Sequence, residues 1–344
     1  MIDDKLRAAY GEATGAAGDS ATVTRLPGGA GNRTYWRVSK QGDASVVVME
    51  LPAEPARSEE ASKPEPAREL PFLNVRRYLA RLGMRVPALL VDRSQAGYLV
   101  LEDLGDVTFG KALQGSADWG AMYGKAIDVI AGVRARAEQA PDAGCVAFGR
   151  AFDFDLYQWE FEHFIEYGLL GRGARPGEAE LAELRRAFTA VSRELYAAPR
   201  GFTHRDYQSS NIMVLPTGEQ VVIDFQDALL GPRQYDLVAL LRDSYVELER
   251  PMVEEMLRRY LRAFAEAGGG RLPEAEFIGF FDLLTVQRKL KDAGRFVFID
   301  RVKKNPSFLV HIPPSLRYVK GALARRPELA AAREILARHV PELR

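Results

Sequence analysis

One stretch, residues 202–227, constrains the fold most because it places polar residues at both ends of a predicted β-hairpin. It reads FTHRDYQSSNIMVLPTGEQVVIDFQD. The apolar runs IMVL and VVI predict two short strands, and the Pro-Thr-Gly sequence that follows the first run is typical of a turn. Asp206 and Asn211 precede the hairpin, and Asp224 follows it. Because a hairpin brings its ends together, we expect these three side chains to lie close to one another.

This set of side chains suits phosphoryl transfer. In that reaction the protein mainly positions the acceptor and the metal ions that neutralise charge on the phosphates. Asp206 suits the base that takes a proton from the acceptor hydroxyl, and Asn211 and Asp224 offer the oxygen ligands that Mg²⁺ prefers. The spacing H-R-D-x-x-x-x-N, followed by a strand ending in D-F, is a protein-kinase-like signature. The alternative is a polar loop whose Asp and Asn cap turns, which explains single residues better than the joint pattern.

Composition bounds the class of protein. A chain of 344 residues with 47% hydrophobic residues is long enough for two lobes with cores. Lys+Arg and Asp+Glu are both 47, so the net charge gives no indication of nucleic-acid binding. The only cysteine, Cys145, excludes an internal disulfide and is expected to be a structural thiol. No signal peptide or membrane-spanning run is predicted. We therefore expect a cytoplasmic monomer that binds neither nucleic acid nor membrane.

The order of predicted elements indicates an α+β fold with two lobes. Strands dominate the first part and helices the second, as in a protein-kinase-like fold with a small antiparallel β lobe and a larger helical lobe. We place the small lobe, with the nucleotide-binding sheet, at 1–103, and the lobe with the catalytic loop and substrate site at 104–344. The predicted strands outside the catalytic hairpin are 23–26, 34–38, 45–51, 89–91 and 98–101. The predicted helices are 2–13, 72–82, 121–137, 152–170, 178–196, 251–267, 274–294, 308–324 and 327–339.

A glycine-rich turn separates the first two strands. Backbone N–H groups in such a turn can approach a polyphosphate closely, although a plain hairpin turn is equally consistent with the local sequence. The residues that we assign to nucleotide binding here are Gly28, Gly29, Gly31, Asn32 and Arg33.

The third strand departs from the kinase pattern, because VVVME contains no lysine for the phosphates. Either Arg33 or Arg37 replaces that lysine, or metal alone neutralises the charge. After the last strand of the small lobe, Glu102 and Leu104 occupy the hinge position, where backbone groups would bind the adenine edge.

Other polar residues have structural interpretations. Asp236 precedes an apolar run and is expected to be the N-cap of a helix. Glu160 and Glu162 are expected to be solvated helix carboxylates, with a role in the substrate cleft as the alternative.

Several stretches make the chain resemble the aminoglycoside phosphotransferase superfamily. HRDYQSSNIM (204–213) and VIDFQDALLGPRQYDLVALLRDSY (222–245) carry its catalytic motifs, and YLVLEDLG (98–105) and QRKLKDAGRF (287–296) are similar to bacterial cell-wall-recycling sugar kinases. Those kinases phosphorylate the anomeric hydroxyl of N-acetylmuramate and N-acetylglucosamine. The resemblance implies ATP as donor, Mg²⁺ as cofactor, an amino sugar as acceptor, Asp206 as base, and Asn211 and Asp224 as metal ligands.

The acceptor contacts stay open at this point. Four residues lie near the reaction by sequence, and each could touch substrate or shape the loop: Arg205, Gln208, Gln226 and Asp227. Two other functions compete with the sugar kinase. One is the same chemistry on an aminoglycoside, choline or homoserine. The other is a catalytically silent nucleotide-binding module, which the missing lysine would explain.

Overall fold

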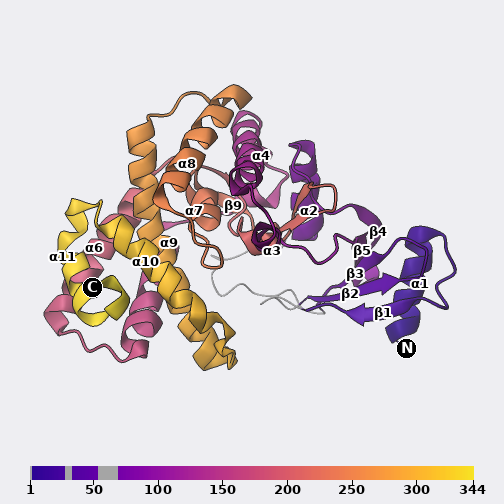
Figure 1. The fold of residues 1–344 in the computed structure, drawn as a ribbon, viewed down its shortest axis with the longest axis horizontal. Helices are drawn as coiled ribbons and strands as arrows, with labels where there is room; N and C mark the ends of the chain where they lie inside the picture. The colour runs from indigo at the N-terminus through magenta and orange to yellow at the C-terminus, as the bar shows by residue number, and fades with distance from the viewer. Residues whose placement is uncertain (1, 28–32, 53–68) are drawn as a thin grey trace.

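The computed structural model describes residues 2–27, 33–52 and 69–344. A small sheet with one helix lies at one end of the molecule, and a larger helical body forms the rest (Figure 1). The expected α+β architecture with two lobes is therefore confirmed. The glycine-rich residues 28, 29, 31 and 32 lie outside the described residues.

The small sheet is antiparallel, with strand order β1-β2-β3-β5-β4. Its central strand β3 carries the sequence VVVME, which is apolar on both faces. Val46 and Val48 pack with helix α1, while Val47 and Met49 face the core shared with the large lobe. This alternation follows from the two-residue period of a strand. The elements are α1 (Ile2–Thr14), β1 (Thr22–Arg25), β2 (Thr34–Ser39), β3 (Val46–Glu50), β4 (Leu89–Arg93) and β5 (Tyr98–Glu102).

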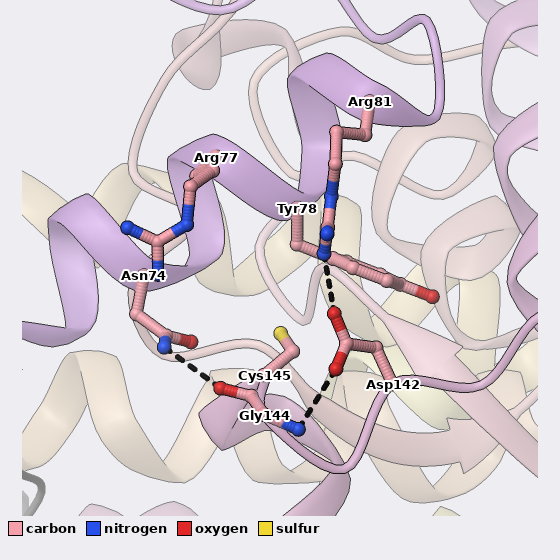
Figure 2. Close-up of a pocket in the computed structure, with 7 residues that line it drawn as sticks. All are labelled: Asn74, Arg77, Tyr78, Arg81, Asp142, Gly144 and Cys145. Carbon is pink, nitrogen blue, oxygen red and sulfur yellow. Dashed lines mark hydrogen bonds and ion pairs between the residues drawn. The ribbon is translucent and has the colours of Figure 1, made fainter.

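Helix α2 (Pro71–Arg81) joins the small sheet to the helical body. Phe72 stacks on Phe225 with ring centroids 5.0 Å apart. The amide of Asn74 donates to the carbonyl of Gly144 at 2.9 Å and accepts from the Val146 N–H at 2.8 Å. Figure 2 shows that α2 faces the loop that contains the buried Cys145. Burial raises the pKa of this thiol, as expected for a structural cysteine.

Two short two-stranded sheets flank the loop that contains Asp206 within the helical body. β6 (Arg200–Thr203) pairs with β9 (Leu229–Pro232), and β7 (Ile212–Val214) pairs with β8 (Gln220–Val222), which confirms the predicted hairpin. The buried guanidinium of Arg134 donates to the carbonyls of Phe202 at 2.9 Å and Gly231 at 3.1 Å. It therefore fixes the sheet of β6 and β9 to helix α4 (Trp119–Gln139).

The helices of the large lobe surround these sheets. Helix α9 is longer than the predicted 274–294, and the predicted helix 308–324 is a 3₁₀ segment (Pro306–His311) followed by α10. No helix among the described residues is both long enough and apolar enough to span a bilayer. The helices are α3 (Phe109–Gln114), α4 (Trp119–Gln139), α5 (Phe154–His163), α6 (Glu178–Ala197), α7 (Tyr235–Leu241), α8 (Arg250–Phe264), α9 (Glu274–Lys303), α10 (Ile312–Leu323) and α11 (Ala330–His339).

The predicted helix 152–170 also differs from the structure. It begins at Phe154, because the carboxylate of Asp153 accepts the Leu156 N–H at 2.7 Å as an N-cap. It then changes to a π-helical turn at Phe164–Leu169. At this turn the backbone of Phe164 lies against Gly294 of α9, where an added Cβ would be 2.9 Å from the Phe164 Cα. The close helix contact requires glycine at position 294.

We expect Gly294→Ala to lower the free energy of unfolding by about 1–3 kcal/mol, because a methyl group there meets backbone that cannot move aside. Gly279→Ala on the same helix is the control. Its Cβ would meet only the flexible end of Arg326 at 3.7 Å, so it should be neutral or stabilise by up to about 1 kcal/mol. Denaturant unfolding measures both, and equal effects would contradict the proposed close contact.

Candidate active site

The loop after β6 is held by the side chain of Asp236. Its two carboxylate oxygens accept the backbone N–H groups of His204 at 2.8 Å and Arg205 at 2.9 Å. Arg205 has a φ of 80°, a conformation that costs free energy in a residue other than glycine. The expectation that Asp236 caps a helix is wrong, because α7 has Gln234 at its N-cap and Asp236 points back to the loop. The carboxylate thus stabilises a strained backbone.

His204 ties the loop to the strand that precedes Asp224. Its ring Nε2 lies 3.1 Å from the carbonyl oxygen of Ile223, and its ring packs edge-on against Tyr207. Burial lowers the pKa of His204 below its ordinary value, so the imidazole is neutral and Nε2 carries the hydrogen that Ile223 accepts.

The carboxylate of Asp206 lies where the loop opens to solvent, with 37% of its side chain exposed. Its Oδ1 is 3.4 Å from a guanidinium nitrogen of Arg288, which also donates to the carbonyl of Arg205 at 3.0 Å. Burial raises the pKa of Asp206, but Arg288, Arg205 and Lys291 more than offset it, so the pKa lies below the ordinary value. Asp206 is therefore ionised at neutral pH and can accept a proton.

Asn211 and Asp224 are brought together by the hairpin. The Ile223 N–H donates to the backbone carbonyl of Asn211 at 3.0 Å, directly before Asp224. The side-chain amide of Asn211 donates to the Asp206 carbonyl at 2.9 Å, which leaves its Oδ1 on the other side of the amide group. The three polar residues expected to cluster around the hairpin therefore do so.

Asp224 is exposed and has a φ of 65°. Gln226 donates to Asp224 at 2.8 Å and to Asp227 at 3.0 Å. The protein atoms around the Asp224 carboxylate partly desolvate it and raise its pKa, and the nearby carboxylates Asp206 and Asp227 raise it further. Such crowding of negative charge is what a bound cation would relieve. Within the described part of the chain, no three His, Cys, Asp or Glu side chains converge as a metal site. A Mg²⁺ ion held by one or two protein oxygens completes its coordination with water and phosphate oxygens.

The two candidate replacements for the missing lysine differ in position. Arg37 donates to Asp103 at 2.7 Å and to Asp106 at 2.9 Å, so its guanidinium is paired with two carboxylates around the hinge. Arg33 lies near Asp224, whose pKa it lowers against the effect of burial. Of the two, only Arg33 faces the site.

The hinge residues have distinct environments. The carboxylate of Glu102 pairs with Arg85, and its backbone N–H donates to the Ala88 carbonyl at 3.0 Å. Leu104 packs against Met213 and Val221 of the catalytic hairpin. The hinge and the hairpin therefore adjoin.

Sequence reasoning missed the contribution of helix α9 to this site. Every residue from Phe281 to Lys291 is buried, including three cationic side chains, those of Arg288, Lys289 and Lys291. Glu160, expected to be solvated, is 1% exposed and accepts from the Gln287 amide at 2.5 Å. The expected solvation holds for Glu162, which pairs with Arg185 at an exposed position. The available signal was the charged QRKLKD segment directly after the apolar run LLTV of the same helix.

The comparisons with known proteins agree with this geometry. The chain is 34% identical over 310 residues to an N-acetylmuramate/N-acetylglucosamine kinase of Pseudomonas aeruginosa, which covers 89% of this chain and 85% of the relative. It is 32% identical to the kinase of the same name from Neisseria meningitidis, covering 87% and 84%.

A solved structure shows the same fold at low sequence identity. A spectinomycin phosphotransferase, solved with ADP and spectinomycin, superposes with a TM-score of 0.60 at 12% identity and covers 96% of this chain and 98% of that one. The family model described as the phosphotransferase enzyme family matches residues 22–272, which is more than half of the chain. From the matched catalytic loop, the shared fold and these relatives together, we conclude that the chain belongs to the phosphotransferase enzyme family.

Proposed function

We propose that this protein is an ATP-dependent sugar kinase that phosphorylates N-acetylmuramate and N-acetylglucosamine. The observation that carries the proposal is the ionised Asp206, on a loop whose backbone is hydrogen-bonded to Asp236. The 34% identity to a kinase named for these two sugars supports the choice of acceptor. Asp206 would take the proton of the acceptor hydroxyl as the phosphoryl group is transferred.

Asn211 and Asp224 would hold Mg²⁺ on the nucleotide side of Asp206. The crowded carboxylates around Asp224 fit a cation, and both residues supply oxygen ligands. When bound, the metal would neutralise charge on the transferred phosphoryl group. Gln226, hydrogen-bonded to Asp224 and Asp227, would orient these carboxylates rather than contact the acceptor.

The nucleotide would lie between the two lobes, with residues 1–103 forming its small-lobe side and 104–344 contributing the catalytic loop and acceptor site. Arg33 would contact the phosphates beside the glycine-rich residues, since a guanidinium can pair with two phosphate oxygens. The N–H of Glu102 is already used within the sheet, so the adenine edge would be bound by the Glu102 carbonyl and the Leu104 N–H.

The acceptor would lie against the catalytic loop and α9. Arg205, Gln208 and Asp227 would border this space from the loop side. We place the transferred phosphate on the anomeric hydroxyl, which is more acidic than other sugar hydroxyls and needs less help from a single carboxylate base. Cationic acceptors such as choline or an aminoglycoside are disfavoured, because the positive charges of Arg288 and Lys291 act on the Asp206 carboxylate and would repel a cation there. A silent nucleotide-binding module is disfavoured by the ionised and exposed Asp206.

Asp206→Asn should lower kcat by at least about 100-fold while leaving the KM for ATP within a few-fold of wild type, because the base acts on the acceptor and not on the nucleotide. Steady-state kinetics with N-acetylglucosamine measure both constants. Asp155→Asn, at an exposed position of α5, is the matched control and should have no effect. A variant at position 206 that keeps a tenth of the normal kcat would contradict the role.

Asp224→Ala should abolish Mg²⁺-dependent ATP binding together with turnover. Asn211→Ala should reduce turnover more than nucleotide affinity, because a carboxylate holds Mg²⁺ more strongly than an amide does. Titrations of each variant with ATP at several Mg²⁺ concentrations separate the two roles. An unchanged Mg²⁺ dependence in Asp224→Ala would refute its assignment as a ligand.

The 1-O-methyl glycoside of N-acetylglucosamine should not be phosphorylated, because its anomeric oxygen carries no proton. The 6-O-methyl ether, which keeps the anomeric hydroxyl, is the matched control and should remain a substrate. The product from the free sugar should lose its reducing end and be cleaved by mild acid. Phosphorylation of the methyl glycoside would show that another hydroxyl is used.

A further inference from the structure

Three cationic side chains of helix α9 are buried beside the base. Arg288 and Lys289 are 2% exposed and Lys291 is 8% exposed. Transfer of a charge into a protein interior is costly unless it is paired with an opposite charge. A cluster of this kind therefore needs either carboxylates of the protein or an anionic ligand.

Each carboxylate near these cations has a hydrogen-bond donor close by. Asp206 is approached by Arg288 at 3.4 Å, and Glu160 accepts from Gln287 at 2.5 Å. Asp292 accepts a hydrogen bond from Lys289 at 2.6 Å. Lys289 also donates to the hydroxyl of Ser244 at 2.6 Å, so its ammonium is well satisfied inside the protein.

Lys291 has the weaker pairing. Its Nζ lies 3.4 Å from Asp292 Oδ1, on a carboxylate that it shares with the closer Lys289. Burial disfavours the charge on Lys291, but Tyr235, Asp292 and Glu160 raise its pKa on balance, so the ammonium stays protonated. Lys291 is therefore a charged group whose nearest carboxylate is shared with a second ammonium.

The position of Lys291 relative to the base suits one substituent of the acceptor. Lys291 is three residues beyond Arg288 on α9, and residues with this spacing are neighbours on one helix face, with Cβ atoms about 5–6 Å apart. Arg288 contacts Asp206, where the reacting hydroxyl would lie. A substituent of the acceptor that reached Lys291 would thus lie about one sugar ring away from the reacting oxygen. N-acetylmuramate carries a lactyl carboxylate on its ring, and N-acetylglucosamine has a hydroxyl there.

We propose that Lys291 binds the lactyl carboxylate of N-acetylmuramate and sets the preference for this sugar over N-acetylglucosamine. The inference rests on the proposed function, since it concerns the acceptor of the same site. Arg288 keeps a different role, because it holds the catalytic loop through Asp206 and the carbonyl of Arg205.

The test compares kcat/KM for three acceptors: N-acetylmuramate, its methyl ester and N-acetylglucosamine. In Lys291→Met, the ratio of kcat/KM for N-acetylmuramate to kcat/KM for N-acetylglucosamine should fall about tenfold or more, the loss expected for a charge-assisted hydrogen bond, whereas a loss that arises at Asp206 would be common to both sugars. Wild type should lose a similar factor when the carboxylate is esterified, and the variant should no longer distinguish acid from ester. Lys303→Met, an exposed lysine of the same helix, is the control and should change no ratio.

Each other outcome is decisive. Equal losses on all three acceptors in Lys291→Met would show that Lys291 acts only on the fold or on the Asp206 carboxylate, and an unchanged preference for the acid would assign the lactyl carboxylate to another cation. If Lys291→Met does not fold, the wild-type comparison of acid and ester decides, because equal values would overturn the inference. Wild type that phosphorylates neither amino sugar would instead refute the proposed function itself.

Discussion

The catalytic loop depends on the pairing of one buried carboxylate with two backbone N–H groups. Asp236 accepts from His204 and Arg205, and the second of these residues has the left-handed backbone that turns the chain toward Asp206. Buried N–H groups without partners are costly, so this carboxylate both satisfies the loop and offsets its strain. The direction of the base, the contact between Arg288 and the Arg205 carbonyl, and the position of the following hairpin all follow from it.

Around this loop the protein places charge in its interior rather than excluding it. Helix α9 is buried all round at its centre, yet it carries a guanidinium and two ammonium groups there. Such groups lower stability unless they are paired, and a well-packed apolar helix would serve the fold as well. The charges are therefore best understood through the acceptor site. Arg288 and Lys291 lower the pKa of Asp206, which keeps this carboxylate ionised, and their positive charge fits the neutral or anionic sugar that we propose as the acceptor.

The sequence contained enough information for the elements whose signals are local. The hairpin, and with it the proximity of Asp206, Asn211 and Asp224, was predicted correctly because turn chemistry and the two-residue period of the strands are local signals. Asp236 was misread because a polar residue before an apolar run has the same local pattern whether it caps a helix or reaches a distant loop. The π-helical turn after α5 likewise depends on Gly294, far along the chain. The roles of Glu160 and Arg288 required knowledge of which helices meet.

Helix α2 has a mechanical consequence for the site. It is buried between the sheet of the small lobe and the helical body, and its Phe72 stacks on Phe225, the residue directly after Asp224. Asn74 fixes the same helix to the loop at Gly144 (Figure 2). If the small sheet rotates about the hinge, it must therefore slide across α2 or strain the contact between the Phe72 and Phe225 rings. Closure of the two lobes over a nucleotide would in this way be coupled to the orientation of the Asp224 carboxylate.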